Sequence, residues 1–135
     1  MGGWSSSLSS GLYGSESLSL NWERCQGNAW CPLTSVDLGH PHFVGFEGVY
    51  IVWRPSDRRA IRVGQGAIAD RLRVHRADPE ILAYGLNTTL LATWARVSAT
   101  HRDGVERYLG DQLNPLVGGA FPNARPIAVN LPGAV

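Results

Sequence analysis

The sequence predicts an α+β domain in which a small antiparallel or mixed three-stranded sheet is flanked by helices, in the order β-β-α-β-α. Two stretches, residues 47–53 and 59–63, alternate between two faces as strands do. Apolar residues recur at helical spacing in residues 67–77 and again after Thr100, with a third alternating stretch between them. Because the turn between the first two strands is short, we expect them to form an antiparallel hairpin.

The hairpin is expected to bury apolar side chains. A Pro-Ser-Asp turn separates its two strands, and these residue types favour turns. Val49, Ile51 and Trp53 share one face of the first strand, Tyr50 and Val52 share the other, and Ile61 and Val63 of the second strand are both predicted to face inward.

Glycine and proline mark the ends of the next elements. A Gly-Gln-Gly run is predicted to end the second strand and to start the helix at residues 67–77, which an Asp-Pro pair then stops. A short helical turn is expected at residues 80–84, and the third strand covers residues 90–98.

The last helix has its own start and stop signals. Thr100 is predicted to cap it, with Asp103 three residues later as an approximate capping box. Asn114 and Pro115 end it. Its apolar stripe consists of Val105, Tyr108, Leu109 and Leu113.

Composition divides the chain into four parts. Residues 1–20 are rich in Ser and Gly, and we expect a flexible leader because they bury too little apolar surface to offset their ordering entropy. Residues 21–45 form a loop-like segment with Cys, His and Trp. Residues 46–116 hold the predicted domain, and residues 117–135 are expected to be an extended Pro- and Gly-rich tail packed on it.

Positive charge is concentrated in one segment. The 135-residue chain has a net charge of +1, but residues 51–76 hold seven arginines against Asp57 and Asp70. Arginine binds phosphate through a rigid two-pronged fork, so the local charge favours a nucleic-acid partner. No apolar run reaches the roughly 18 residues that cross a bilayer, and no export signal is visible, so we expect a cytoplasmic protein without a membrane partner.

The element order and five sequence matches together resemble the GIY-YIG nuclease family over residues 46–116. The matches are to the first signature tripeptide, part of the second signature, the helical arginine, the metal-binding glutamate and the late asparagine. In that order they are Gly48-Val49-Tyr50, Arg62-Val63-Gly64, Arg71, Glu106 and Asn114. His75 follows Arg71 by one turn, on the same helix face.

The resemblance implies a phosphodiester hydrolase that uses Mg²⁺ or Mn²⁺. One carboxylate with waters and phosphate oxygens suffices to hold Mg²⁺, and Glu106 is the candidate ligand. Arg71 is the candidate clamp on the charge that develops on the phosphoryl oxygens. Tyr50 is the candidate for holding or deprotonating the water, and His75 for donating to a phosphate oxygen or assisting proton transfer.

Each of these residues also has a purely structural interpretation. Tyr50 fits a half-buried strand aromatic, and Arg71 fits a surface residue paired with a neighbouring carboxylate. His75 fits a residue packed over the helix with one hydrogen bond, and Glu106 fits an i, i+4 partner of Arg102.

Arg62 departs from the family pattern, because it replaces the tyrosine that begins the second signature. Arginine cannot act as a base. Either Tyr50 acts alone with Arg62 as an added phosphate anchor, or the domain has lost cleavage and keeps phosphate binding; we favour retained cleavage. Alternation places Tyr50 and Arg62 on the same sheet face. The candidate phosphate-binding residues are Arg62, Gln65, Arg73 and Asn114.

A cysteine–histidine segment offers a second candidate site. Its four zinc-type ligands lie within eighteen residues, but their spacing matches no standard finger or ribbon. Two buried cysteines and two loop histidines are therefore the preferred interpretation over a structural Zn²⁺ site. A disulfide is not expected in a reducing cytoplasm. The four residues are Cys25, Cys31, His40 and His42.

The function we expect is metal-dependent endonuclease activity on nucleic acid, with DNA favoured. The alternatives are a catalytically inactive nucleic-acid-binding module and a small zinc-scaffold or interaction protein. No targeting element is apparent in the sequence, so a partner protein or a second copy of the chain is expected to supply targeting.

Overall fold

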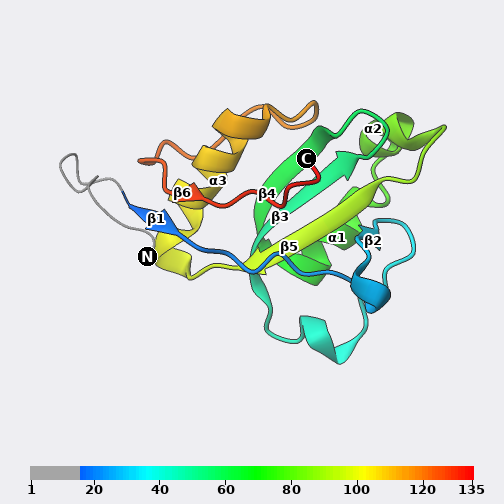
Figure 1. The fold of residues 1–135 in the computed structure, drawn as a ribbon, viewed down its shortest axis with the longest axis horizontal. Coiled ribbons are helices and arrows are strands. Elements are labelled where there is room, and N and C mark those ends of the chain that lie inside the picture. Colours follow the sequence, from blue (N-terminus) through cyan, green and yellow to red (C-terminus); the bar gives the residue numbers. More distant parts are fainter. Residues whose placement is uncertain (1–15) are drawn as a thin grey trace.

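A computed structural model describes residues 16–135, and it has the α+β architecture that the sequence predicts (Figure 1). The five predicted central elements occur in the predicted order, with a short α2 after the first helix. The strands are β1 (Ser17–Leu18), β2 (Cys31–Pro32), β3 (Glu47–Arg54), β4 (Arg59–Ala67), β5 (Leu91–Arg96) and β6 (Ala128–Val129). The helices are α1 (Ile68–His75), α2 (Pro79–Leu82) and α3 (Ala99–Leu113), with 3₁₀ turns η2 (Gln26–Asn28), η3 (Pro41–Phe43) and η4 (Ala83–Gly85).

The main sheet has four antiparallel strands in the order β2-β5-β3-β4, so the prediction of three strands was wrong. The additional strand, β2, comes from the cysteine-containing segment, where Cys31 pairs with Ala92 and is fully buried. Two residues are too few to show a strand period in the sequence. A separate two-stranded parallel sheet joins β1 to β6.

Strand β4 continues through the glycines that were predicted to end it. Gly64 pairs with Tyr50 and Gly66 pairs with Gly48, so the hairpin is longer than predicted. The Tyr50 ring occupies the space above Gly64, where a Cβ atom would overlap the tyrosine hydroxyl. The glycine here serves close packing across two strands and does not end the strand.

Two apolar cores lie on opposite faces of the sheet. The α1-side core includes Tyr50, Val52, Leu72 and Trp94, and the α3-side core includes Val49, Ile51, Trp53, Val105 and Leu109. The predicted division of the β3 side chains between two faces is confirmed. Figure 1 shows α3, in yellow to orange, on one side of the strands.

The prediction that Ile61 and Val63 share a face was wrong. Ile61 packs in the α1-side core and Val63 in the α3-side core. A register shift between Val52 and Trp53 leaves Ile61 as the extra residue on β4. Such a bulge breaks the two-residue alternation on which the prediction depended.

Helix α3 begins earlier than predicted. Its N-cap is Ser98, and neither Thr100 nor Asp103 forms the predicted capping box. The Asp103 carboxylate instead accepts a hydrogen bond from the Gln65 side chain. The helix ends at Asn114 in the left-handed conformation (φ 45°), in agreement with the predicted stop.

Both ends of the described chain pack on the domain. The predicted leader covers residues 1–20, of which 1–15 lie outside the described residues. Leu18 and Leu20 pack against the α3-side core, as do the buried Ile127 and Val129 of the tail. Within residues 16–135, no helix is both long and apolar enough to span a membrane.

Candidate active site

The site begins with a buried hydrogen bond between Tyr50 and His75. Tyr50 lies in the middle of β3 with none of its surface exposed, and His75 is the last residue of α1 with 3% exposed. The Tyr50 Oη and His75 Nε2 atoms are 2.6 Å apart. The ring's other nitrogen, Nδ1, is buried and has no hydrogen-bond partner among the described residues.

His75 is held in its neutral form. The His75 pKa falls from 6.5 to about 4, first because the ring is buried and then because Arg62 and Arg71 carry positive charge, while Asp78 opposes the shift. At neutral pH the imidazole is therefore uncharged, and Nε2 can accept the Tyr50 proton or donate its own, depending on the tautomer.

Arg62 and Arg71 approach this pair from two elements. On β4, Arg62 pairs with Val52, and Gly64 pairs with Tyr50 two residues further on. Residues two apart on a strand share a face, so the predicted placement of Arg62 and Tyr50 on one face is confirmed. The aliphatic part of Arg71 lies against Gly66. Both Nε atoms are buried without an acceptor among the described residues.

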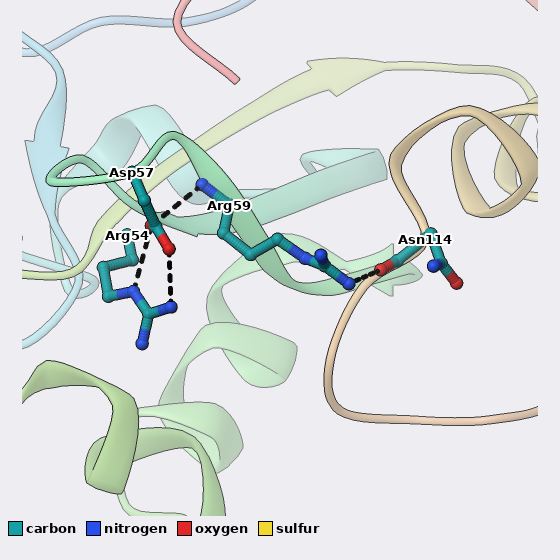
Figure 2. Close-up of polar contacts among 4 residues, drawn as sticks. All are labelled: Arg54, Asp57, Arg59 and Asn114. Atoms are coloured by element: carbon teal, nitrogen blue, oxygen red, sulfur yellow. Dashed lines mark hydrogen bonds and ion pairs between the residues drawn. The ribbon is translucent and has the colours of Figure 1, made fainter.

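The other five arginines of residues 51–76 are bound to acceptors of the protein itself. Figure 2 shows two of them: Arg54 forms a two-pronged ion pair with Asp57, and Arg59 donates to the Asn114 carbonyl oxygen at 3.0 Å. The remaining three, Arg58, Arg73 and Arg76, donate to the carbonyl oxygens of Gly133, Leu38 and Val36, respectively. The local charge excess is thus largely structural, and within residues 16–135 Arg62 and Arg71 are the two of the seven whose side chains donate no hydrogen bond to the protein.

Glu106 lies near the same two arginines but approaches from α3. Its pKa is raised, first by burial and also by Asp103, while the hydrogen bond from Gln65 and the charges of Arg62 and Arg71 lower it. Gln65 Nε2 donates to Glu106 Oε1 at 2.7 Å and to Asp103 Oδ1 at 2.8 Å. Because β4 is the edge strand of the sheet, side chains from both faces meet around this edge.

The carboxylates are chemically suited to Mg²⁺ or Mn²⁺, which prefer oxygen ligands. Within residues 16–135, however, no group of three His, Cys, Asp or Glu side chains is arranged to hold a metal. Glu106 and Asp103 share one amide donor, so they offer two carboxylates at one place. Any cation here would complete its shell with water and substrate oxygens.

The sequence did not single out Asp103 as a site residue. It lies three residues before Glu106 on α3, and residues at this spacing share a helix face. That spacing was a signal in the sequence, but Asp103 also fitted a capping box. Recognition of its second role required the position of Gln65 on β4.

Two of the predicted phosphate-binding residues lie elsewhere. Arg73 faces away from Arg71 on α1 and contacts Asp70 and the Leu38 carbonyl oxygen. Asn114 ends α3 and accepts from Arg59, at the far end of β4 from Gly64. Neither contacts the Tyr50–His75 pair in the described structure.

The cysteine–histidine segment forms a disulfide instead of offering thiolates. Cys25 and Cys31 are bonded, with their Cα atoms 5.3 Å apart, so the expectation of unpaired cysteines was wrong. A distance of this size is ordinary for a disulfide and could not be known from spacing alone. His42 Nε2 accepts from the Trp94 indole at 3.0 Å, and His40 Nδ1 accepts from the His42 amide at 3.0 Å. The four residues therefore do not assemble as a zinc site here.

Comparison with known proteins provides no further assignment. No protein-family model, no curated protein and no solved structure matches the chain. The site consists of a buried phenol–imidazole pair, two arginines whose Nε atoms have no acceptor among the described residues, and a half-buried carboxylate.

Proposed function

We propose that the chain hydrolyses phosphodiester bonds in nucleic acid, with DNA favoured, through a metal-dependent site of GIY-YIG type. The observation that supports this most is the convergence of four side chains from three elements. Tyr50 of β3 is bonded to His75 of α1, and Arg71 acts electrostatically on both His75 and Glu106 of α3. This set combines a charge clamp, a carboxylate and a proton-transfer pair.

Arg71 is the clamp on the phosphoryl group in this proposal. Its Nε is buried without an acceptor, and its guanidinium forms no ion pair with any residue in the described part of the chain. Negative charge spreads over the phosphoryl oxygens in the transition state, and a fixed guanidinium stabilises that charge without reorganisation.

Tyr50 and His75 would manage the proton of the attacking water. The phenol is bonded directly to a neutral imidazole, so a proton that reaches Tyr50 has an acceptor at His75 Nε2. Bound phosphate next to Arg62 and Arg71 offsets the positive charge that helps to keep the His75 pKa low, which improves the imidazole as an acceptor.

Glu106, together with Asp103, is the group that would hold Mg²⁺ or Mn²⁺. The bound cation would polarise the phosphate and acidify water. Gln65 fixes the orientation of both carboxylates through its amide, in the way that outer-shell hydrogen bonds orient metal ligands.

The test is nicking of labelled supercoiled DNA by the purified chain with Mg²⁺ or Mn²⁺. We expect Glu106→Gln and Arg71→Gln each to lower the rate by about 100-fold or more, the scale of one lost transition-state donor. The matched control is Arg73→Gln, which removes the same charge from the opposite side of α1 and should cut normally. Absence of cutting by the parent chain, or full activity of Glu106→Gln, would refute the proposal.

One observation favours the alternative of a non-catalytic nucleic-acid-binding module. Tyr50 has no exposed surface, and Arg62 stands where the family has a second tyrosine. The module would bind DNA in a strongly salt-dependent manner without a metal requirement. If the Arg62→Tyr variant binds DNA in a salt-dependent manner and gains the ability to cut it, the parent chain belongs to this alternative.

A further inference from the structure

Four buried side-chain nitrogen atoms lack a hydrogen-bond partner among the described residues, and three of them belong to His75 and to the two arginines that act on its charge. The fourth is Nε of Arg59, whose Nη2 donates to the Asn114 carbonyl oxygen. The Nε atoms of Arg62 and Arg71 and the Nδ1 atom of His75 are all buried and lack partners among the described residues. Buried polar groups are nearly always hydrogen-bonded, so such a set indicates a missing acceptor. Glu106, on which both arginines act electrostatically, already accepts a hydrogen bond from Gln65.

We propose that Arg62 and Arg71 together form a cradle that binds a phosphate group without the help of a metal ion. The proposal deepens the function proposed above, because it assigns the phosphate of the substrate to these two residues and gives the residue that replaces the signature tyrosine a binding role. Two guanidinium forks are suited to a tetrahedral oxyanion, since each can donate two parallel hydrogen bonds.

The tail holds Arg62 in this position. The amides of Leu116 and Val117 donate to the carbonyl oxygens of Ala60 and Ile61 at 3.2 Å and 2.8 Å, which brings the tail along the β4 edge. Gly118 then lies against the Arg62 guanidinium, and a Cβ atom at Gly118 would be 2.6 Å from Nη1. Its φ of +84° also favours glycine.

The charge balance also favours an anion. Each of the other five arginines of residues 51–76 donates to a carbonyl or carboxylate oxygen, whereas Arg62 and Arg71 donate to no acceptor within the described chain and interact electrostatically with Glu106. Half-buried positive charges without a close partner are costly, and a bound oxyanion would offset that cost. Both residues are only half-buried, so their outer nitrogen atoms stay accessible to a ligand.

Binding of an oxyanion here should also be felt by His75. The groups that influence its charge are Tyr50 from β3, Arg62 from β4, Arg71 from α1 and Asp78 after α1. An anion between the two arginines would counter their charge, so the His75 pKa should rise from its value of about 4. This response separates binding at the cradle from binding at exposed arginines.

The experiment is titration of the full chain with inorganic phosphate in the presence of a chelator, followed by calorimetry and by NMR of the His75 ring. We expect binding by the parent chain and a loss of about 10-fold or more in affinity for Arg62→Gln and Arg71→Gln. The matched control Arg73→Gln should bind as the parent does. Arg62→Lys, which keeps the charge but loses the fork, should fall between the parent and Arg62→Gln.

Clear outcomes would overturn the cradle. The proposal is refuted if Arg62→Gln binds phosphate as tightly as the parent chain, or if Arg73→Gln loses as much affinity as Arg62→Gln. It is also refuted if acetate binds as tightly as phosphate, or if phosphate leaves the His75 pKa unchanged. Gly118→Ala provides a second check, since it crowds Arg62 without removing any charge and should also weaken phosphate binding.

A competition experiment separates this proposal from the proposed function. If phosphate binds and a short DNA duplex does not displace it, the cradle stands and the nucleic-acid function fails. If the chain cuts DNA but Arg62→Gln binds phosphate and cuts as the parent does, the function stands and the cradle fails. Displacement of phosphate by the duplex supports both.

Discussion

Successive residues of β3 enter two very different environments. Ile51 and Trp53 point into the α3-side core, where apolar side chains from α3, the tail and the segment before β2 surround them. Tyr50, the residue before Ile51, points to the α1 side. There it is hydrogen-bonded to a buried histidine, close to two arginines whose Nε atoms lack acceptors among the described residues. The α3-side face of the strand therefore contributes packing energy, whereas the α1-side face combines an apolar core with polar groups that are incompletely satisfied.

The two environments differ in how much they contribute to stability when no ligand is bound. Complete burial of apolar groups makes the α3 side favourable whatever ligand is present. The surroundings of Tyr50 lower the stability of the fold when no ligand is bound, because polar groups are buried there without hydrogen-bond partners. Polar groups in such a state are a common feature of functional sites.

The largest expected effect is on the apolar side. Trp53→Ala should lower the free energy of unfolding by about 3–5 kcal/mol, because it removes a fully buried ring that packs edge-on against Trp30 with ring centroids 5.3 Å apart. Chemical denaturation measures this. Val44→Ala is the control, since Val44 is 81% exposed and should change stability by no more than about 0.5 kcal/mol. A loss below about 1 kcal/mol for Trp53→Ala would contradict the division into two environments.

The next effect is on the polar side and depends on pH. The His75 pKa is about 4 in the fold and 6.5 in the unfolded chain, so the unfolded state binds the proton first as pH falls. The chain should lose about 3 kcal/mol of stability between pH 6.5 and pH 4 from this group alone. The stability is fully present above pH 6.5.

This prediction is checked by denaturation curves across that pH range. His75→Gln should lack this part of the pH dependence, while the matched variant His101→Gln, at a partly exposed histidine, should retain it. An unchanged pH profile in His75→Gln would show that the histidine is not held neutral by its surroundings.

The disulfide should have a somewhat smaller effect. It joins Cys25 to Cys31, six residues apart, and fixes the fully buried Cys31 within the α1-side core. Reduction by a phosphine should lower stability by about 2 kcal/mol, the value that loop-closure entropy gives for so short a loop. Matched melts with and without reductant measure this, and identical curves, with loss of the bond confirmed by mass, would contradict it.

The smallest effect concerns the Tyr50–His75 bond itself. Tyr50→Phe keeps the ring over Gly64 but removes the hydroxyl, which leaves a second nitrogen of His75 without a partner. We expect a loss of about 1–2 kcal/mol. Tyr108→Phe on α3 is the control for removal of a hydroxyl from a tyrosine on the other face. Equal stability of Tyr50→Phe and the parent chain would mean that the bond is not retained in solution.

Much of the central fold followed from periodicity. The two-residue alternation of β3 and β5 and the helical stripe of α3 were strong, local signals, and they gave the α+β class and the order of the central elements. The same reasoning failed where a feature was too short or depended on a distant partner. Strand β2 has two residues, and the bulge at Ile61 is visible only from the register with β3.

Part of the site was also predictable. Tyr50, Arg71 and Glu106 were chosen because they match the motifs of the GIY-YIG family, and His75 because it follows Arg71 by one helical turn. In the structure Tyr50 is hydrogen-bonded to His75, and Arg71 acts electrostatically on His75 and Glu106. Arg73 was chosen for its charge alone, which does not show that its guanidinium is already bound to the Leu38 carbonyl oxygen.

The sequence alone determined which segments would become strands and helices and which side chains had the chemistry to bind phosphate, because both depend on residue type and local spacing. Only the tertiary structure decided which arginines keep a free hydrogen-bonding capacity. Acceptors come from residues far along the chain, such as the tail carbonyl of Gly133 for Arg58. The tertiary structure also decided that Gly118 lies against Arg62, because that contact requires the tail to pair along the edge of β4.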